Sequence, residues 1–189
     1  QQLERWIAPE VWKKGDAPIN EDALEGGCVR QANLSDVPAI AELIAYWSGK
    51  GEHLPRKTED IMQAIHTFAV AECDGKVVGC GALYVYGTGL AEIRSLGLKP
   101  EQTGQGLGAE LVQFSLNQAR QLGIQRVIVL TRQPAFFARL GFTQADKSTW
   151  PEKVMKDCEF CPRKHACDET GLEFWLKNTG KKVISTIQI

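Results

Sequence analysis

Three glycines at alternate positions, Gly104, Gly106 and Gly108, form the stretch of this sequence best suited to chemistry. They open a long segment in which apolar residues recur about every 3.6 positions, as on one face of a helix. Glycine lets a backbone approach a phosphate closely, and the first N–H groups of a helix have no partner inside it. The helix dipole adds about half a positive charge at the same end. The spacing therefore predicts an anion cradle at the start of a helix.

Two common nucleotide-binding motifs do not fit this turn. A P-loop needs Gly-Lys-Ser/Thr after its second glycine, whereas Gly108 is followed by Ala109 and Glu110. The dinucleotide-binding fingerprint needs G-x-G-x-x-G and an acidic residue about 20 positions later, but position 128 lies in an apolar run at 127–130. A plain structural turn is a further alternative, because glycine often only interrupts a loop.

A second constellation combines three cysteines and a histidine: Cys158, Cys161, His165 and Cys167. Thiolates and imidazoles at short spacing are the ligands of tetrahedral structural zinc sites. The spacing is tighter than in common zinc motifs, since only Ala166 separates His165 from Cys167. Two interpretations stay open: a structural zinc site, or a loop of reduced thiols that packs an insert beside the substrate pocket.

The composition is that of an ordinary globular protein. The 189 residues carry 22 basic and 23 acidic side chains, a net charge of −1, so no overall field attracts nucleic acid or an anionic membrane. The sequence has neither an apolar run of about 18 residues nor a basic-then-apolar leader pattern. We therefore expect a cytoplasmic protein that acts on small molecules, with no nucleic-acid or membrane partner. The six cysteines favour thiols or a metal site over disulfides.

The elements that must position these groups are both strands and helices. Strand patterns occupy 28–31, 68–72, 77–86, 90–98, 125–131 and 172–177, and a short strand begins at Phe142. An Asp-Gly turn at 74–75 joins two of them as a hairpin. Helices are predicted at 36–47 after a Ser35 cap, after a Thr58 cap, from Gly108 to about Leu122, and at 134–140. The cysteine-rich segment that follows has no regular pattern.

Three parts of the chain follow from these patterns. We expect an N-terminal arm at 1–27, one domain at 28–177 with a cysteine-rich insert at 151–169, and a C-terminal tail at 178–189. The arm carries two tryptophans, which are rarely left exposed. We therefore expect it to pack on the domain or on a second copy of the chain, as in a homodimer.

The order of elements resembles that of the GNAT N-acetyltransferases over 28–177. The GQGLG run at 104–108 is similar to the family's motif A, and FFARLGF at 136–142 is similar to its motif B. Several stretches resemble more narrowly the short, kinase-less N-acetylglutamate synthases: KGxxLPR at 50–56, AEIRSL at 91–96, LT at 130–131 and PxKVxxDCxxCPxxxxCDE at 151–169. The sequence departs from the family at Thr103, where Gln or Arg is usual, and at Gly97, where Ala is usual.

This resemblance implies an α/β (α+β) fold of the GNAT type, with a central mixed, mostly antiparallel, splayed sheet and flanking helices. It also implies that main-chain groups of Leu96 and Leu98 hold the pantetheine arm of acetyl-CoA, with the Leu96 N–H on the acetyl oxygen. The pyrophosphate is then held by Thr103, Gly104, Gln105, Gly106, Leu107, Gly108 and Ala109. Leu96 and Leu98 are alternatively plain core residues, and main-chain contacts are compatible with both roles.

Glu92 is the general base that the resemblance favours. Strand alternation places its side chain on the same face as those of residues 94, 96 and 98, near the thioester. The alternative is a surface glutamate paired with Arg94. The usual leaving-group acid, a tyrosine of the motif B helix, is missing because Phe136 and Phe137 occupy that region. Water or a hydroxyl must then protonate the thiolate, and the candidate hydroxyls are Ser95, Thr131, Tyr84 and Tyr86.

An acidic amino-acid substrate needs cationic partners for its carboxylates, and arginine binds them bidentately. The candidates are Arg56 in a connector, Arg94 beside Glu92, and Lys153 in the insert. A solvated surface charge is the alternative for each of them.

The sequence thus predicts an enzyme that transfers the acetyl group of acetyl-CoA to the α-amino group of L-glutamate or L-glutamine, the first step of arginine biosynthesis. Attack is direct, in a ternary complex, because no cysteine or serine lies in an activated triad pattern. The alternatives are a GNAT acetyltransferase for another small amine or a protein N-terminus, and a non-catalytic module that binds acyl-CoA or zinc.

Overall fold

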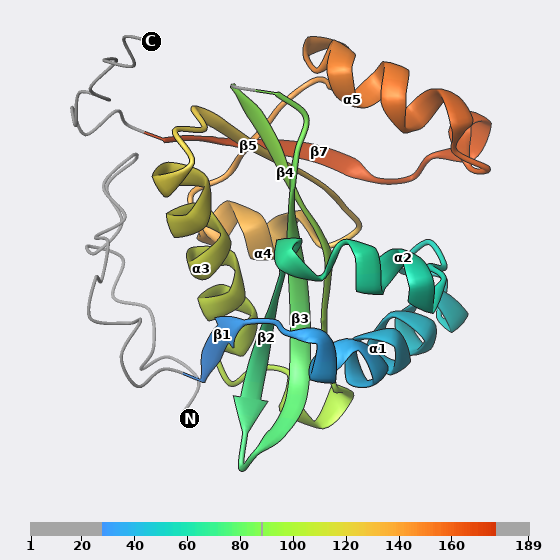
Figure 1. Cartoon of the computed structure of the whole chain (residues 1–189). Coiled ribbons are helices and arrows are strands. Elements are labelled where there is room, and N and C mark those ends of the chain that lie inside the picture. The colour runs from blue at the N-terminus through green and yellow to red at the C-terminus, as the bar shows by residue number, and fades with distance from the viewer. Residues whose placement is uncertain (1–27, 88, 177–189) are drawn as a thin grey trace, which may run out of the picture.

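The computed structural model describes residues 28–87 and 89–176, which form a seven-stranded sheet in the order β1-β2-β3-β4-β5-β7-β6 (Figure 1). Neighbouring strands are antiparallel, except that β4 and β5 run parallel. The predicted mixed, mostly antiparallel sheet is confirmed. The strands are β1 Val29–Gln31, β2 Phe68–Cys73, β3 Lys76–Val85, β4 Leu90–Leu98, β5 Arg126–Thr131, β6 Thr143–Gln144 and β7 Thr170–Trp175.

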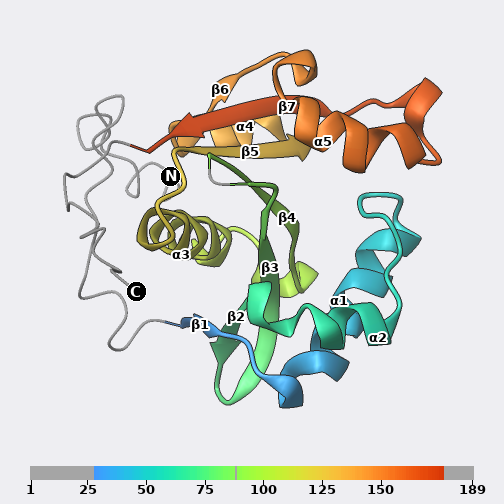
Figure 2. The same cartoon turned by 45° about the horizontal axis from the view of Figure 1, so that its top comes forward.

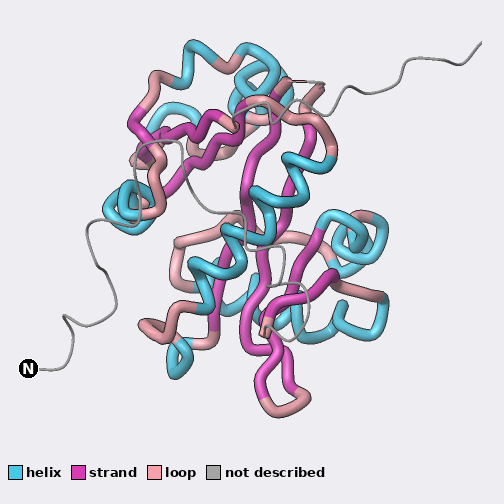
Figure 3. Tube along the Cα trace, turned by 90° about the vertical axis from the view of Figure 1, so that its left-hand side faces the viewer, coloured by secondary structure: helices cyan, strands magenta, loops and turns pink. Residues whose placement is uncertain are grey.

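Helices cover both faces of this sheet (Figure 3). They are α1 Val37–Gly49, α2 Thr58–Gln63, α3 Leu107–Gln121, α4 Pro134–Arg139 and α5 Pro151–Lys156. Figure 2 shows α1 and α3 on opposite sides of β3. Alternation along β2 supplies both interfaces, because Phe68 and Val70 pack under α1 while Ala69 and Ala71 pack under α3. The predicted GNAT arrangement of a sheet with flanking helices is therefore present.

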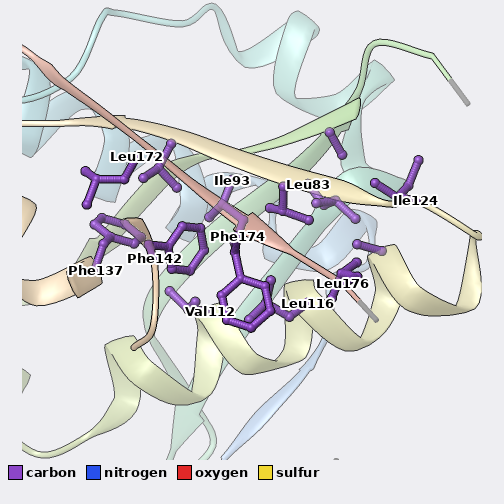
Figure 4. Packing of buried hydrophobic residues seen from close by; sticks show 14 residues of the cluster. Leu83, Ile93, Val112, Leu116, Ile124, Phe137, Phe142, Leu172, Phe174 and Leu176 are labelled. Carbon is purple, nitrogen blue, oxygen red and sulfur yellow. The ribbon is translucent and has the colours of Figure 1, made fainter. Parts of the chain in front are cut away.

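A separate core cluster joins α3 and α4 to the half of the sheet made by β5 and β7 (Figure 4). Val112 and Leu116 of α3 pack there against three phenylalanines, Phe137, Phe142 and Phe174. The Phe142 ring lies between the other two, and its centroid is 5.4 Å from that of Phe137 and 5.3 Å from that of Phe174. This packing fixes β5 and α4 relative to α3.

Two helix starts differ from the prediction. Asn33, not Ser35, caps the segment that leads into α1, because its side chain accepts the Ser35 N–H while the Asp36 carboxylate accepts the Asn33 N–H. Asparagine is at least as good a cap as serine, and this reciprocal pair satisfies two otherwise free donors. Thr58 is the first residue of α2 rather than its cap, and the residue before it makes no side-chain capping bond.

The insert predicted as irregular begins with a helix, α5. Pro151 stands at the first helical position, where its fixed φ favours a helix start. Trp150, which is fully buried, anchors the helix against β7, and a Cβ at Gly171 would lie 2.7 Å from its ring. The predicted arm at 1–27 and tail at 178–189 lie outside the described residues. Across the described stretches, no helix has the length and hydrophobicity needed to span a bilayer.

Candidate active site

Strands β4 and β5 separate soon after they meet. Their pairing runs from Leu90 opposite Arg126 to Glu92 opposite Ile128 and then stops, although β4 continues to Leu98. The two strands diverge visibly in Figure 2. Beyond Glu92, the main-chain groups of β4 that point away from β3 have no partner strand within 28–87 and 89–176, so they form an open hydrogen-bonding edge there.

Ser95 interrupts the alternation of β4. Its φ of 55° is left-handed, and the register with β3 shifts at this level, as in a β-bulge. Before the bulge Glu92 faces Lys153 of α5, whereas after it Leu96 and Leu98 pack with the cluster under α3. The prediction that Glu92 and Leu96 share one face is therefore wrong, because the bulge shifts the two-residue period by one.

Two aromatic side chains from the α1 side bind the open edge of β4. Trp47 Nε1 donates to the Leu98 carbonyl at 2.8 Å, and His53 Nε2 lies 3.0 Å from the Leu96 carbonyl. Gly97 makes this approach possible, since a Cβ there would lie 2.7 Å from the indole. Burial lowers the pKa of His53, so the neutral ring donates through Nε2. The N–H groups of Leu96 and Leu98 are left for a ligand.

The glycine turn has the geometry that an anion cradle requires. No acceptor within the described chain takes the backbone N–H groups of residues 104–108, which we call the amide cradle. Gly104 and Gly106 have φ values of 80° and 91°, and α3 begins directly after them. The first bonded amide is that of Ala109, which donates to the Gly106 carbonyl at 2.9 Å. Thr103 is exposed, and its hydroxyl donates to the Pro100 carbonyl at 2.8 Å.

Helix α4 lies against the cradle. A Cβ at Gly108 would be 3.3 Å from the Phe136 ring and 3.7 Å from the Leu98 side chain, so the third glycine permits close packing of α3, α4 and β4. The side chains of Phe136 and Phe137 have no group that could donate a proton in this region. The Thr131 hydroxyl accepts the Gln133 N–H at 2.9 Å and so helps to shape the start of α4.

Glu92 lies at the centre of a cluster of charged side chains. Its Oε2 accepts hydrogen bonds from the Tyr86 hydroxyl at 2.7 Å and from Lys153 Nζ at 2.9 Å. Both donors also contact Oδ2 of Asp157, with Lys153 Nζ at 3.0 Å, and Arg94 lies 3.3 Å from the same oxygen. We call these five residues the charge cluster. The cluster contains two carboxylates and two cations, so each charge has an opposite partner. Charged side chains are buried in proteins only when they are paired in this way.

The surroundings fix the charge states of three members. Burial, reinforced by the negative charges of Glu92 and Asp157, raises the pKa of Tyr86, so it stays a neutral phenol. Burial acts to lower the pKa of Lys153, but the two carboxylates outweigh it and raise that pKa. Burial acts to raise the pKa of Asp157, but hydrogen bonds from Tyr86 and Lys153 outweigh it and lower that pKa. Lys153 and Asp157 are therefore both ionised at neutral pH.

The three predicted carboxylate-binding cations have different surroundings. Arg56 has no ion-pair partner among the described residues, and burial followed by the nearby charge of Arg94 lowers its pKa. The guanidinium of Arg94 stacks 3.6 Å from the centre of the Tyr84 ring and also pairs with Asp157. Lys153 is buried, with its ammonium bound to two carboxylates inside the protein. Arg56 is thus the candidate best placed to bind a carboxylate from outside.

The predicted zinc site is not formed. Among residues 28–87 and 89–176, no group of three or more His, Cys, Asp or Glu side chains is arranged to hold a metal ion. The segment folds into two short turns that give its thiols separate partners: Cys161 Sγ accepts the Arg163 N–H at 3.4 Å, and Cys167 Sγ lies 3.0 Å from Lys147 Nζ. Cys158 and His165 do not join them, and all three cysteines are free thiols.

Several residues of this site had no assigned role in the sequence analysis. Asp157 was part of a family pattern only, and Trp47 and His53 were given no role. A signal for Asp157 exists, because Pro151 marks a helix start and positions 153 and 157 then share one helix face. Trp47 and His53 lack such a signal, since their partners are carbonyls on a distant strand.

Comparison with known proteins places this geometry in a family. The family model described as "Acetyltransferase (GNAT) family" matches residues 38–142. An uncharacterized N-acetyltransferase of Chlorobaculum tepidum is 39% identical over 145 residues, which cover 77% of this chain and 94% of that protein. An amino-acid acetyltransferase of Mycobacterium tuberculosis is 46% identical over 121 residues, which cover 62% of this chain and 69% of that protein.

Among solved structures, the N-acetylglutamate synthase of Neisseria gonorrhoeae, complexed with coenzyme A and N-acetyl-glutamate, superposes with a TM-score of 0.72 at 30% identity. The match covers 79% of this chain but only 35% of that longer one. By sequence and by fold, this chain belongs to the GNAT family of acetyltransferases.

Proposed function

We propose that this enzyme transfers the acetyl group of acetyl-CoA to the α-amino group of L-glutamate or L-glutamine, as the first step of arginine biosynthesis. The observation that carries the proposal is one continuous arrangement. The amide cradle at 104–108 adjoins the open edge of β4, and this strand leads to a buried carboxylate, Glu92, flanked by Arg56 and Arg94.

The cradle suits the pyrophosphate of acetyl-CoA. Five successive N–H groups at the start of a 15-residue helix offer both hydrogen bonds and the positive end of the helix dipole. The pantetheine arm then extends along β4, where the N–H groups of Leu96 and Leu98 pair with no other strand of the described part of the chain. The Leu96 N–H is the donor that we assign to the acetyl oxygen, where it stabilises the negative charge of the transition state.

The nucleophile is the substrate amine, and Glu92 is the base that deprotonates its ammonium. Among the described residues, Oε2 of Glu92 has two donors and Oε1 has none, which leaves Oε1 for the substrate. A base within hydrogen-bond reach of the reacting nitrogen contributes typically about 10²–10⁴-fold in rate. A covalent acyl-cysteine is disfavoured, because burial raises the pKa of Cys80 to about 12 and also raises the pKa of Cys158.

An amino acid with an acidic or amide side chain fits the cations beside Glu92. Arg56 is free to bind the α-carboxylate or the side chain bidentately, and Arg94 retains donors beyond its contact with Asp157. The names of relatives point the same way, since one is an amino-acid acetyltransferase and another is an N-acetylglutamate synthase solved with N-acetyl-glutamate.

The test is an assay of CoA release from acetyl-CoA against the twenty amino acids, a polyamine and a peptide with a free N-terminus. We expect the highest kcat/KM with glutamate or glutamine, an N-acetylated product by mass, and sequential rather than ping-pong kinetics. A preference for the polyamine or the peptide would overturn the substrate assignment. Binding of CoA without turnover of any amine would instead support a non-catalytic module.

A further inference from the structure

The base of the proposed reaction is enclosed, although the reaction must release a proton. An ammonium and acetyl-CoA give an N-acetyl product and free CoA thiol, so one of the two protons lost by nitrogen goes to the thiolate and the other goes to solvent. The Glu92 side chain is only 4% exposed. A proton accepted there needs a path to the surface that does not cross the bound substrate.

The charge cluster contains a hydrogen-bonded chain in the required direction. The Tyr86 hydroxyl lies 2.7 Å from Glu92 Oε2 and also contacts Asp157 Oδ2. A tyrosine hydroxyl has one proton to donate, and its oxygen accepts. With both carboxylates ionised, the single hydroxyl proton is shared between the two contacts, so neither carboxylate keeps a full hydrogen bond from Tyr86. Once Glu92 gains a proton, however, Glu92 donates to Tyr86 while Tyr86 donates to Asp157, and both contacts become hydrogen bonds.

We propose that Tyr86 and Asp157 form a proton relay that carries the substrate's proton from Glu92 to solvent. Glu92 accepts the proton at Oε1, and a half-turn about its Cγ–Cδ bond brings that proton to the Tyr86 side. The proton then passes to the Tyr86 oxygen as Tyr86 passes its own proton to Asp157 Oδ2. Asp157 releases this proton to water, which restores two carboxylates and a neutral phenol. The relay rests on the proposed acetyl transfer, in which Glu92 is the base.

The properties of each member suit this role. Asp157 caps the C-terminal end of α5 and its side chain is 30% exposed, so it connects the buried base to solvent. Hydrogen bonds from Tyr86 and Lys153 outweigh burial and lower the pKa of Asp157, so it loses an acquired proton readily. The raised pKa of Tyr86 disfavours a phenolate, so this residue passes on one proton only as it receives another.

Other charged groups face the relay from each neighbouring element. Arg94 comes from β4, Lys153 from α5, Arg56 from the connector before α2, and Cys158 from the turn after α5. Lys153 bridges the two carboxylates and positions them, and its raised pKa keeps it charged over the working range. Arginine side chains stay protonated in proteins, so the two arginines add a constant charge to the surroundings of the relay.

The relay is tested by Tyr86→Phe, which removes the hydroxyl and keeps the ring, with Tyr46→Phe on the exposed face of α1 as the matched control. We expect kcat of Tyr86→Phe to fall about tenfold, with KM for both substrates little changed. We also expect added imidazole to restore kcat in this variant and not to raise it in the wild type, because a small buffer base replaces the missing proton path. Tyr46→Phe should match the wild type.

A second pair of variants, at Asp157, tests the relay if the Tyr86→Phe protein does not fold. Asp157→Asn should lose kcat and regain it with imidazole, whereas Asp157→Glu should retain most of it. The relay is overturned if imidazole does not restore the lost kcat, or if neither Tyr86→Phe nor Asp157→Asn loses kcat. In both cases, acetylation by the wild type still supports the proposed function. A wild type that acetylates no amino acid overturns the proposed function, and the relay with it.

Discussion

The amide cradle and the charge cluster lie at two ends of one open strand edge, and they are built in different ways. The cradle uses only backbone groups of five consecutive residues, shaped by the left-handed conformations of Gly104 and Gly106. The cluster uses side chains from β4, the β3–β4 turn and α5, and its hydrogen bonds join residues 61 and 71 positions apart. The first is local in sequence and the second depends on the complete fold.

This difference decides how each region responds to substitution. Backbone donors remain when a side chain changes, so the cradle is damaged only where a new residue cannot adopt the required φ. Members of the cluster share donors and acceptors, so the loss of one leaves a buried charge unpaired and alters the others. We therefore expect effects in the cluster to be large and non-additive, and effects in the cradle to be smaller and confined to acetyl-CoA.

The largest expected effect is that of Glu92→Gln in the charge cluster. Glutamine keeps the shape but accepts no proton, so kcat should fall about 10²–10⁴-fold, with KM for acetyl-CoA little changed. Steady-state kinetics against Glu42→Gln, an exposed position on α1, provide the comparison. Full turnover by Glu92→Gln would remove the base assignment and, with it, the functional contrast between the two regions.

Arg56→Ala comes next, because this guanidinium has no ion-pair partner among the described residues. A charge-assisted contact to a substrate carboxylate contributes about 1.5–3 kcal/mol, so KM for the amino acid should rise about tenfold to a hundredfold. KM for acetyl-CoA should stay the same. Arg139→Ala, at the exposed end of α4, is the matched control. Equal amino-acid KM values for Arg56→Ala and wild type would rule Arg56 out.

The cradle is tested by Gly106→Ala against Gly123→Ala. These glycines flank α3, have φ values of 91° and 75°, and leave open space around an added Cβ. Each substitution should cost about 1–2 kcal/mol in stability, because alanine disfavours this conformation. Only Gly106→Ala should also raise the Kd of acetyl-CoA, by about tenfold, since relaxation of its backbone turns N–H groups away from the phosphates. Calorimetry measures both quantities, and equal Kd values would refute the cradle.

The same contrast explains what the sequence could predict. The strand order, helices α1 to α4 and the hairpin at 74–75 follow from local periodicity and turn residues, and the structure has all of them. The free amides of the glycine turn likewise follow from glycine spacing, whereas α5 lies in a segment predicted as irregular. The face shared by Glu92 and Leu96 was predicted wrongly, because a bulge at Ser95 depends on pairing with β3. Glu92 and Lys153 were singled out separately, but their pairing required α5 to fold back on β4, which no local pattern specifies.

The smallest expected effect is a pH dependence of stability from Asp157. Hydrogen bonds from Tyr86 and Lys153 outweigh burial and hold its pKa below the ordinary 3.8. The folded protein therefore binds this proton less readily than the unfolded chain, so the stabilisation is complete above about pH 4 and is lost as pH falls through the lower folded pKa.

Thermal unfolding from pH 7 to 3 measures this effect, and the stability advantage of wild type over Asp157→Asn should shrink as the pH falls. In a Tyr86→Phe background, where one donor is gone, the change should be smaller. A constant advantage at every pH would mean that Asp157 contributes packing rather than charge, and the contrast with the uncharged cradle would lose its electrostatic basis.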